Sequence, residues 1–262
     1  MRDIEPYTFL KAASEWEKPP VDNVGYIPAY ALRNLPDKIL MDIMDHAASE
    51  RYALDGWRNK GNKWRELLGL DTTNGKCIMD FGCGIGIEAR EFAKSGNHMI
   101  LADIVQNNIM LAQRVLELDG YASLVTMVNE EAPFFSVPPI DIFYANGVLH
   151  HTPLFREILQ CAVAALAPGG EVRLMLYSDK GWTFATDTPP PPIEANVCDH
   201  ESFAVFVRKF DGVGHYANWF NREKIEYLVG DFLTVERCDY ICDNDRYLVA
   251  TLKPKEEADG EA

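Results

Sequence analysis

A glycine-rich turn between an apolar strand and a helix is the part of the sequence best suited to bind a ligand. The segment Asp80-Phe81-Gly82-Cys83-Gly84-Ile85-Gly86 follows the strand predicted over 77–79 and opens the next predicted helix. Glycines let the backbone turn sharply and let a ligand approach closely, and the helix that follows presents N–H groups without partners inside the helix. Nucleotide and dinucleotide sites share such loops, so the loop alone predicts only a ligand of that kind.

The glycine spacing and two acidic residues narrow the choice of ligand. The pattern is Gly-x-Gly-x-Gly, whereas dinucleotide sites have Gly-x-Gly-x-x-Gly. Asp80, two residues before the first glycine, would repel a pyrophosphate but could receive an ammonium group. Asp103 ends the next predicted strand, where its two oxygens could accept both hydroxyls of a ribose. A ligand with a ribose and an amine but without phosphate fits the description of S-adenosylmethionine.

Structural explanations of the same residues stay open. The glycine loop could simply turn a strand into a helix without binding anything. Asp103 could only cap the helix that follows it. Cys83 is better explained as a small packing residue than as a nucleophile.

Two adjacent histidines follow the strand predicted over 141–145. His150 and His151 lie after its C-terminal end, where open α/β sheets bind ligands. Methyl transfer from a sulfonium is an in-line displacement, in which the protein mainly aligns donor and acceptor and excludes water. A histidine has a suitable pKa to remove a proton from the acceptor. Both histidines are therefore catalytic candidates, although one or both could only shape the pocket.

Alternating apolar strands and helices supply the scaffold for these residues. Such alternation predicts βαβ units and a mainly parallel sheet with helices on both faces. The last two strands are joined by four residues, too few for a helix, and should form an antiparallel hairpin at the sheet edge. The sequence thus predicts an α/β, Rossmann-like, doubly wound fold of seven strands in three α/β/α layers. The strands are expected over 77–79, 99–102, 124–128, 141–145, 172–177, 234–241 and 246–252.

We assign this domain to residues 75–254 and expect an arm before it, a cap inserted into it and a tail after it. Residues 1–74 are predicted to form an N-terminal arm or lid, irregular over 1–36 and helical after it. Residues 179–220 interrupt the alternation with a polyproline run and many aromatic side chains, which predicts a packed cap. These aromatic side chains could close over a substrate or form only the core of the cap. The polar tail 255–262 is expected to be disordered.

Four motifs in the expected order make the chain resemble the class I S-adenosylmethionine-dependent methyltransferases. The resemblance is strongest to small-molecule enzymes of the ubiquinone-biosynthesis type. The motifs are the glycine loop, Asp103, the segment 141–151 with its Val-Leu-His-His ending, and Leu166-Ala167-Pro168-Gly169-Gly170 before the fifth strand. The resemblance covers about 75–254. It implies S-adenosylmethionine as methyl donor and S-adenosylhomocysteine as product.

The resemblance also implies which residues contact the cofactor. Asp103 would hold the ribose, and Ile104 would lie against the adenine. Glu130 would receive the adenine amine, with Glu131 as the alternative, because Asn129-Glu130-Glu131 stands where the family commonly has Gly-Asp. The full set is Asp80, Gly82, Cys83, Gly84, Gly86, Asp103, Ile104, Glu130, Asn146 and Gly147.

Charge and composition limit the partners. The chain has 25 Lys and Arg against 40 Asp and Glu, a net charge of −15, which argues against nucleic-acid and anionic-membrane surfaces. No apolar run approaches the ~20 residues of a membrane span, and the first residues lack the apolar core of a signal peptide. Six cysteines do not make a disulfide scaffold. Cys238 and Cys242 have no second pair nearby, so no metal site is expected.

We therefore expect a cytoplasmic enzyme that methylates an O or N atom of a small-molecule acceptor, without nucleic-acid or membrane partners. The oligomeric state stays open. The alternatives are a protein that binds S-adenosylmethionine without catalysis, and a methyltransferase directed at protein or tRNA. A local charge of +4 over 51–65 runs against the acidic trend. It could be a solvated helix face, or Arg51 or Arg58 could meet the methionine carboxylate or an anionic acceptor.

Overall fold

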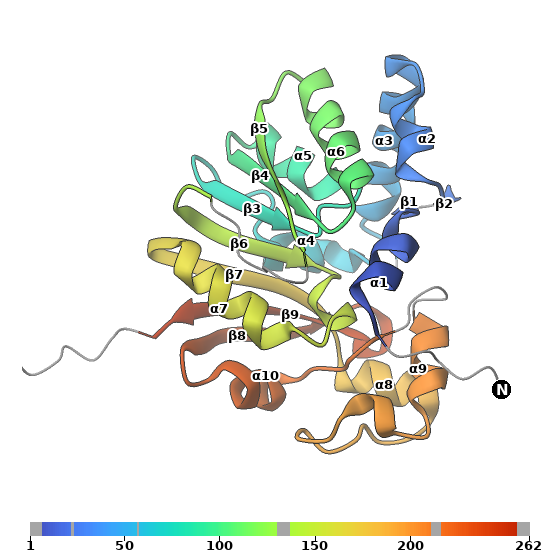
Figure 1. Cartoon of the computed structure of the whole chain (residues 1–262), viewed down its shortest axis with the longest axis vertical. Coiled ribbons are helices and arrows are strands. Elements are labelled where there is room, and N and C mark those ends of the chain that lie inside the picture. The colour runs from blue at the N-terminus through green and yellow to red at the C-terminus, as the bar shows by residue number, and fades with distance from the viewer. Residues whose placement is uncertain (1–6, 22–23, 57, 130–136, 211–215, 256–262) are drawn as a thin grey trace, which may run out of the picture.

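The predicted seven-stranded sheet forms the centre of the molecule (Figure 1). The computed structural model describes residues 7–21, 24–56, 58–129, 137–210 and 216–255. Within them the strand order is β5-β4-β3-β6-β7-β9-β8, and only β9 runs antiparallel to its neighbours. The strands are β3 (Cys77–Phe81), β4 (His98–Asp103), β5 (Ser123–Met127), β6 (Ile140–Asn146), β7 (Leu166–Tyr177), β8 (Leu233–Ile241) and β9 (Tyr247–Pro254). The predicted fold class is confirmed.

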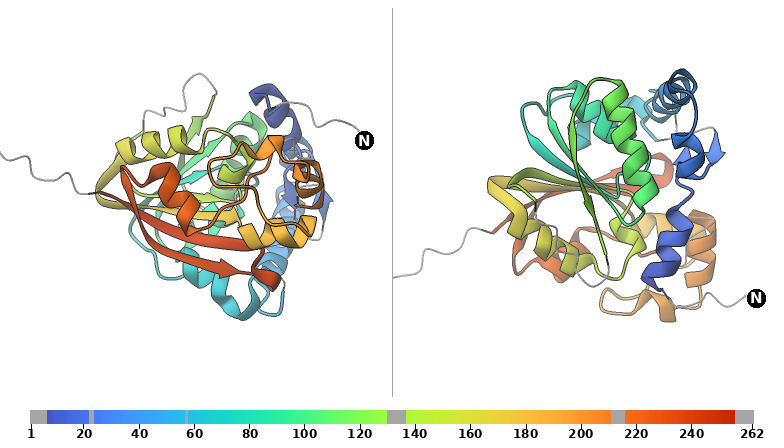
Figure 2. Two further views of the ribbon diagram at one scale, coloured as in Figure 1. Left: turned by 90° about the horizontal axis from the view of Figure 1, so that it is seen from below. Right: turned by 45° about the horizontal axis from the view of Figure 1, so that its top comes forward.

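Helices cover both faces of this sheet and give the expected three layers (Figure 2). One face packs against α4 (Lys63–Leu68), α5 (Ile87–Lys94) and α6 (Gln106–Leu118), and the other against α7 (Phe155–Ala165) and α10 (Arg222–Val229). Successive strand residues point to opposite faces. Ile78 therefore joins the cluster with α5 and α6, whereas Met79 joins the cluster with α7 and α10. Burial on both sides explains why these strands are almost continuously apolar.

The N-terminal arm is more regular than predicted. Residues 1–36 were expected to be irregular, but the described part contains α1 (Phe9–Trp16), a two-stranded sheet of β1 (Pro20–Val21) and β2 (Gly25–Tyr26), and α2 (Ala29–Arg33). These elements are too short to show a clear period in the sequence. Farther along, α3 (Asp37–Arg51) begins at the residue from which helical spacing was recognised. It is followed by η1 (Lys60–Asn62), which precedes α4. Helices α2 and α3 pack on α5 and α6 rather than on the sheet.

The segment after β7 folds as a small cap with its own apolar core. It contains α8 (Asp179–Thr186), η3 (Val197–Asp199) and α9 (Phe203–Phe210). Trp182 and Phe206 are fully buried in that core, and Tyr7 of the arm packs against it. Figure 1 shows α1 lying between this cap and the rest of the arm.

The start of β7 and the turn of the terminal hairpin have details that the sequence did not predict. The Pro168-Gly169-Gly170 turn was placed before the fifth strand, but β7 already begins at Leu166, with a register shift opposite Ile140–Ile142. The hairpin turn η4 (Asp243–Asp245) has positive φ at Asn244 and Asp245. Residues 256–262 of the predicted disordered tail lie outside the described residues. No helix in the described part of the chain has the length and hydropathy of a membrane span.

Candidate active site

The glycine loop leaves β3 and turns back against the end of β4. Gly82, Gly84 and Gly86 have φ values of +76°, +51° and +83°, a region that side chains other than glycine rarely adopt. A Cβ at Gly82 would lie 2.3 Å from a methyl group of Val148, and one at Gly86 would lie 2.8 Å from the Cβ of Ala112. Glycine is thus required at both positions by backbone angle and by space. The loop is fixed in turn by two hydrogen bonds to the carbonyl of Ala102.

Asp103 ends β4 and holds the glycine loop through its carboxylate. One oxygen, Oδ2, accepts from the backbone N–H of Gly84 at 3.0 Å. The other, Oδ1, accepts from the N–H of Val105 at 2.8 Å and from Nδ2 of Asn108 at 3.3 Å. Burial raises the pKa of Asp103 to about 6, although these hydrogen bonds oppose the rise. The carboxylate is therefore an anchored acceptor beside the loop.

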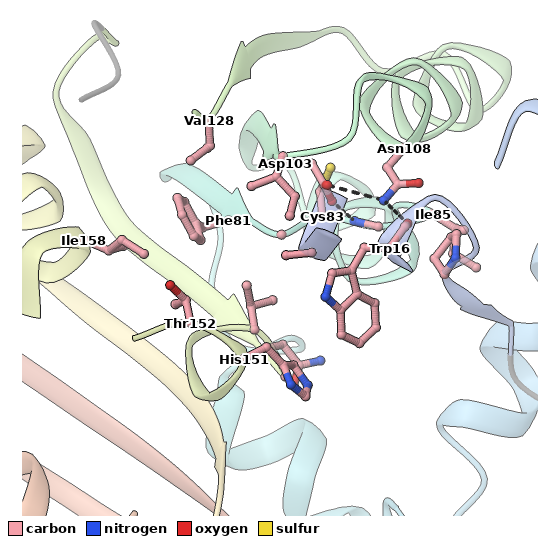
Figure 3. Close-up of a pocket in the computed structure, with 18 of the residues that line it drawn as sticks. Trp16, Phe81, Cys83, Ile85, Asp103, Asn108, Val128, His151, Thr152 and Ile158 are labelled. Carbon is pink, nitrogen blue, oxygen red and sulfur yellow. Dashed lines mark hydrogen bonds between the residues drawn. The ribbon is translucent and has the colours of Figure 1, made fainter. Parts of the chain in front are cut away.

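A pocket opens over this loop and brings together most of the predicted cofactor residues (Figure 3). Together with its open mouth it encloses about 1160 Å³. Its wall contains Gly82, Cys83, Gly84, Asp103, Ile104, Asn146 and Gly147. Gly86 and Asp80 are not among the residues that line it. Glu130 and its alternative Glu131 lie outside the described residues.

Asp80 lies behind the loop in the interior. It is buried, and its Oδ2 has no hydrogen-bond partner among the described residues. Burial raises its pKa well above the ordinary value, and the nearby Glu88 and Asp103 raise it further. The nearby guanidinium of Arg51 and a hydrogen bond from the backbone of Ala89 oppose this rise, and Asp80 does not line the pocket.

The two histidines have different surroundings, because they occupy the short 3₁₀ turn η2 (Leu149–His151). His150 is fully buried, and its ring stacks on Tyr177 with a centroid distance of 3.6 Å. Its Nδ1 accepts from the backbone N–H of Tyr177 at 3.2 Å. Burial lowers its pKa well below the ordinary value, with a smaller contribution from His151. His150 is therefore buried and does not line the pocket, whereas its catalytic role stays a prediction.

His151 lies on the pocket wall. Its Nδ1 is 3.2 Å from the carbonyl oxygen of Tyr216, and its ring lies 4.9 Å from that of Trp16. A carbonyl can only accept a hydrogen bond, so Nδ1 carries the proton in the neutral ring. Nε2 is then the nitrogen that can take up a proton. The cap thus fixes the tautomer of His151 through residue 216.

The arm forms part of the pocket wall. Phe9, Ala12 and Trp16 follow one another at the i, i+3 and i+7 positions of α1, and all three line the pocket. Sequence reasoning missed this face because α1 has only 8 residues. Two aromatic residues of the arm, Tyr26 and Tyr30, are about half exposed and do not line the pocket, and Trp57 lies outside the described residues.

Arg51 and Glu88 form a buried ion pair at the pocket wall, of which the sequence analysis named only Arg51. Nη1 of Arg51 lies 2.6 and 2.7 Å from the two carboxylate oxygens of Glu88. Oε1 of Glu88 also accepts from Nδ2 of Asn146 at 3.0 Å. All three residues line the pocket, whereas the guanidinium of Arg58 lies over the ring of Trp64. Glu88 carried no distinctive signal, because an acid in the first turn of a helix is common.

The comparison with known proteins decides the family. A model of the methyltransferase domain family matches residues 44–229, which include the glycine loop, Asp103 and both histidines. The chain belongs to this methyltransferase family. The predictions of a methyltransferase-type enzyme and of S-adenosylmethionine as cofactor are thereby confirmed at the level of the family.

Individual relatives are distant and are matched over limited stretches. The human mitochondrial ubiquinone biosynthesis O-methyltransferase is 27% identical over 183 residues, which are 64% of this chain and 42% of that protein. A tRNA U34 carboxymethyltransferase of Klebsiella pneumoniae is 29% identical over 123 residues, 45% of this chain and 36% of that protein. The matches thus span less than half the length of these curated relatives.

The fold is shared with solved structures at low sequence identity. An S-adenosylmethionine-dependent methyltransferase from Clostridium acetobutylicum superposes with a TM-score of 0.56 at 10% identity. The superposition covers 81% of this chain and 98% of that one. At this identity the likeness concerns the fold alone.

Proposed function

We propose that the protein transfers the methyl group of S-adenosylmethionine to an O or N atom of a small-molecule acceptor, with His151 as general base. The observation that carries the proposal is the position of His151. It lies on the wall of the pocket that the glycine loop and Asp103 also line, with its Nδ1 held by the carbonyl of Tyr216. A histidine so oriented presents Nε2 as a base beside the cofactor residues.

The residues present fit the cofactor. Gly82 and Gly84 would let the backbone come close to the ligand, and Asp103 would accept the ribose hydroxyls beside Ile104. The ion pair of Arg51 and Glu88 would face the methionine end, with the guanidinium toward a carboxylate and the carboxylate toward an ammonium group. Oδ1 of Asn146, buried and without a partner among the described residues, is a further acceptor for that ammonium group.

The chemistry divides between the cofactor and the chain. When bound, S-adenosylmethionine would supply a methyl group on a positively charged sulfur, and this sulfur would keep the electron pair of the broken bond as a neutral thioether. His151 takes the proton of the acceptor O–H or N–H on Nε2 as the new bond to the methyl carbon forms. The carbonyl of Tyr216 stabilises the resulting imidazolium through Nδ1–H. Trp16 and the rest of α1 exclude water from this end of the pocket.

A small acceptor is supported by the two segments that border the pocket. Phe9, Ala12 and Trp16 of α1 form part of its wall, and the cap contacts His151 through the carbonyl of Tyr216. The net charge of −15 also speaks against a polyanionic substrate. A tRNA substrate stays the second candidate because of the match to the tRNA-modifying relative.

The test is a screen of methyl acceptors. The protein is incubated with S-adenosylmethionine and a panel of phenols, carboxylic acids, amines and unmodified tRNA, and formation of S-adenosylhomocysteine is measured. Turnover with a small hydroxyl or amine compound supports the proposal. Turnover with tRNA alone, or tight cofactor binding without any turnover across the panel, would overturn it in favour of the corresponding alternative.

A further inference from the structure

Asn108 of α6 connects the arm to the carboxylate that is proposed to hold the ribose. Its side chain is buried, and its Nδ2 donates to two acceptors that lie far apart in the sequence (Figure 3). One is Oδ1 of Asp103 at 3.3 Å, and the other is the backbone carbonyl of Trp16 at 3.1 Å. Because both neighbours can only accept, the amide nitrogen rather than the amide oxygen must face them.

The contact with Trp16 satisfies a backbone group of the lid. Trp16 is the last residue of α1, and the last carbonyls of a helix have no partner within it. Asn108 supplies such a partner across 92 positions of sequence. The orientation of this one amide is thus set by the lid on one side and by Asp103 on the other.

The hydrogen bonds of Asp103 leave one place where a ribose hydroxyl fits best. Its contacts with the N–H groups of Val105 and Gly84 measure 2.8 and 3.0 Å, so the contact with Asn108 at 3.3 Å is the longest of the three. A hydroxyl is both a donor and an acceptor. Placed between these two side chains, it can donate to Asp103 and accept from Asn108, which replaces one long hydrogen bond by two.

We propose that Asn108 is a positioning residue that couples cofactor binding to closure of α1, by holding the Trp16 carbonyl with one N–H and a ribose hydroxyl with the other. This inference rests on the proposed function, because it requires the ribose at Asp103. The coupling is reciprocal: the cofactor stabilises the closed lid, and the closed lid orients Asn108 for the cofactor. Trp16 of α1 also packs against His151, which lies at the proposed acceptor end of the pocket. Binding of the cofactor therefore also favours the complete acceptor end.

The first test measures the lid. Hydrogen–deuterium exchange of the peptide that covers α1 is compared with and without saturating S-adenosylhomocysteine. The variants are Asn108→Leu, which has similar size without donors, and Gln106→Ala, an exposed position at the start of the same helix, as control. We expect the ligand to slow exchange in α1 of the wild type and of Gln106→Ala but not of Asn108→Leu. Equal slowing in Asn108→Leu would overturn the coupling. If Asn108→Leu does not fold, Asn108→Ala provides the same comparison.

The second test addresses the hydroxyl directly and separates a positioning role from a structural one. Affinities for S-adenosylhomocysteine and its 2′,3′-dideoxy analogue are measured by calorimetry. For each protein, the ratio of the two dissociation constants gives the loss of affinity on removal of the hydroxyls. We expect this loss to be about three- to tenfold larger for the wild type than for Asn108→Leu. Equal factors in both proteins would overturn the proposed contact.

A variant of Asp103 distinguishes a failure of the proposed cofactor placement from a failure of the role proposed for Asn108. If Asp103→Asn binds S-adenosylhomocysteine as tightly as the wild type, the ribose does not lie at Asp103, and the placement of the cofactor fails together with this inference. If Asp103→Asn weakens binding but the ligand still protects α1 in Asn108→Leu, only the role of Asn108 fails.

Discussion

Lowering the pH should weaken binding of S-adenosylhomocysteine through protonation of Asp103. Burial raises the pKa of this carboxyl group to about 6 in the unliganded protein, above its ordinary value of 3.8. Between the ordinary pKa of 3.8 and the raised value of about 6, the folded protein therefore tends to hold a proton on Asp103 that the unfolded chain would have lost. A protonated carboxyl group is a poor acceptor for ribose hydroxyls, so this proton must leave when the ligand binds.

The size of the effect follows from the titration of one group. A carboxyl group with a pKa of about 6 is ~90% ionised at pH 7 and ~10% ionised at pH 5. The apparent affinity should thus fall about tenfold between these values, or ~1.4 kcal/mol. Calorimetry at pH 5, 6, 7 and 8 measures this directly, and the number of protons released on binding at pH 5.5 provides an independent check.

The variant Asp103→Asn tests whether Asp103, rather than the buried carboxyl groups of Asp80 and Glu88, causes the pH dependence of binding. The variant should bind weakly at every pH and lose the step between pH 5 and 7. An affinity of the wild type that is flat from pH 5 to 8 would refute the assignment of the ribose to Asp103. A step of the same size in Asp103→Asn would refute it as well, because another group would then carry the titration.

Three further predictions concern the loop, the interior and the pocket wall. Gly86→Ala should lower the free energy of unfolding by about 2 kcal/mol or more, because φ is +83° and the new Cβ would meet Ala112; chemical denaturation measures this. Lys224 is buried, and burial lowers its pKa to about 7; Lys224→Met removes this cost together with the hydrogen bond from Nζ to Oδ1 of Asn218, so we expect a net stabilisation of about 1–3 kcal/mol at pH 7. This gain should shrink from pH 7 toward pH 10 as the unfolded lysine also loses its charge, and a constant gain would refute the cause. Arg51→Ala should weaken binding of S-adenosylhomocysteine at least about tenfold, whereas Arg58→Ala should leave it unchanged, both measured by calorimetry.

The sheet and its motifs could be predicted because their signals are local and continuous. Strands such as β3 and β6 are buried on both faces and read as apolar runs. The glycine loop was recognisable because positive φ and close packing restrict its residues to glycine. Family, fold class and cofactor all followed from these segments.

The details of the pocket depend on contacts that the sequence does not display. His150 and His151 are indistinguishable by type and position, but successive residues of a 3₁₀ turn point ~120° apart, so one enters the core while the other faces the pocket. The lid face of α1 consists of three residues on a helix of 8, too short for a period to be recognised. The role proposed for Asn108 depends on two contacts, with Asp103 and with the Trp16 carbonyl 92 positions away, and the second of these has no signal in the sequence.

The most direct test of the proposed chemistry is the turnover of His151→Gln with an acceptor found in the screen. His46→Gln, at an exposed position of α3, is the matched control. We expect His151→Gln to bind S-adenosylhomocysteine as the wild type does while kcat falls about 10²–10⁴-fold. A kcat for His151→Gln close to that of the wild type and of His46→Gln would contradict the role of His151 as the base.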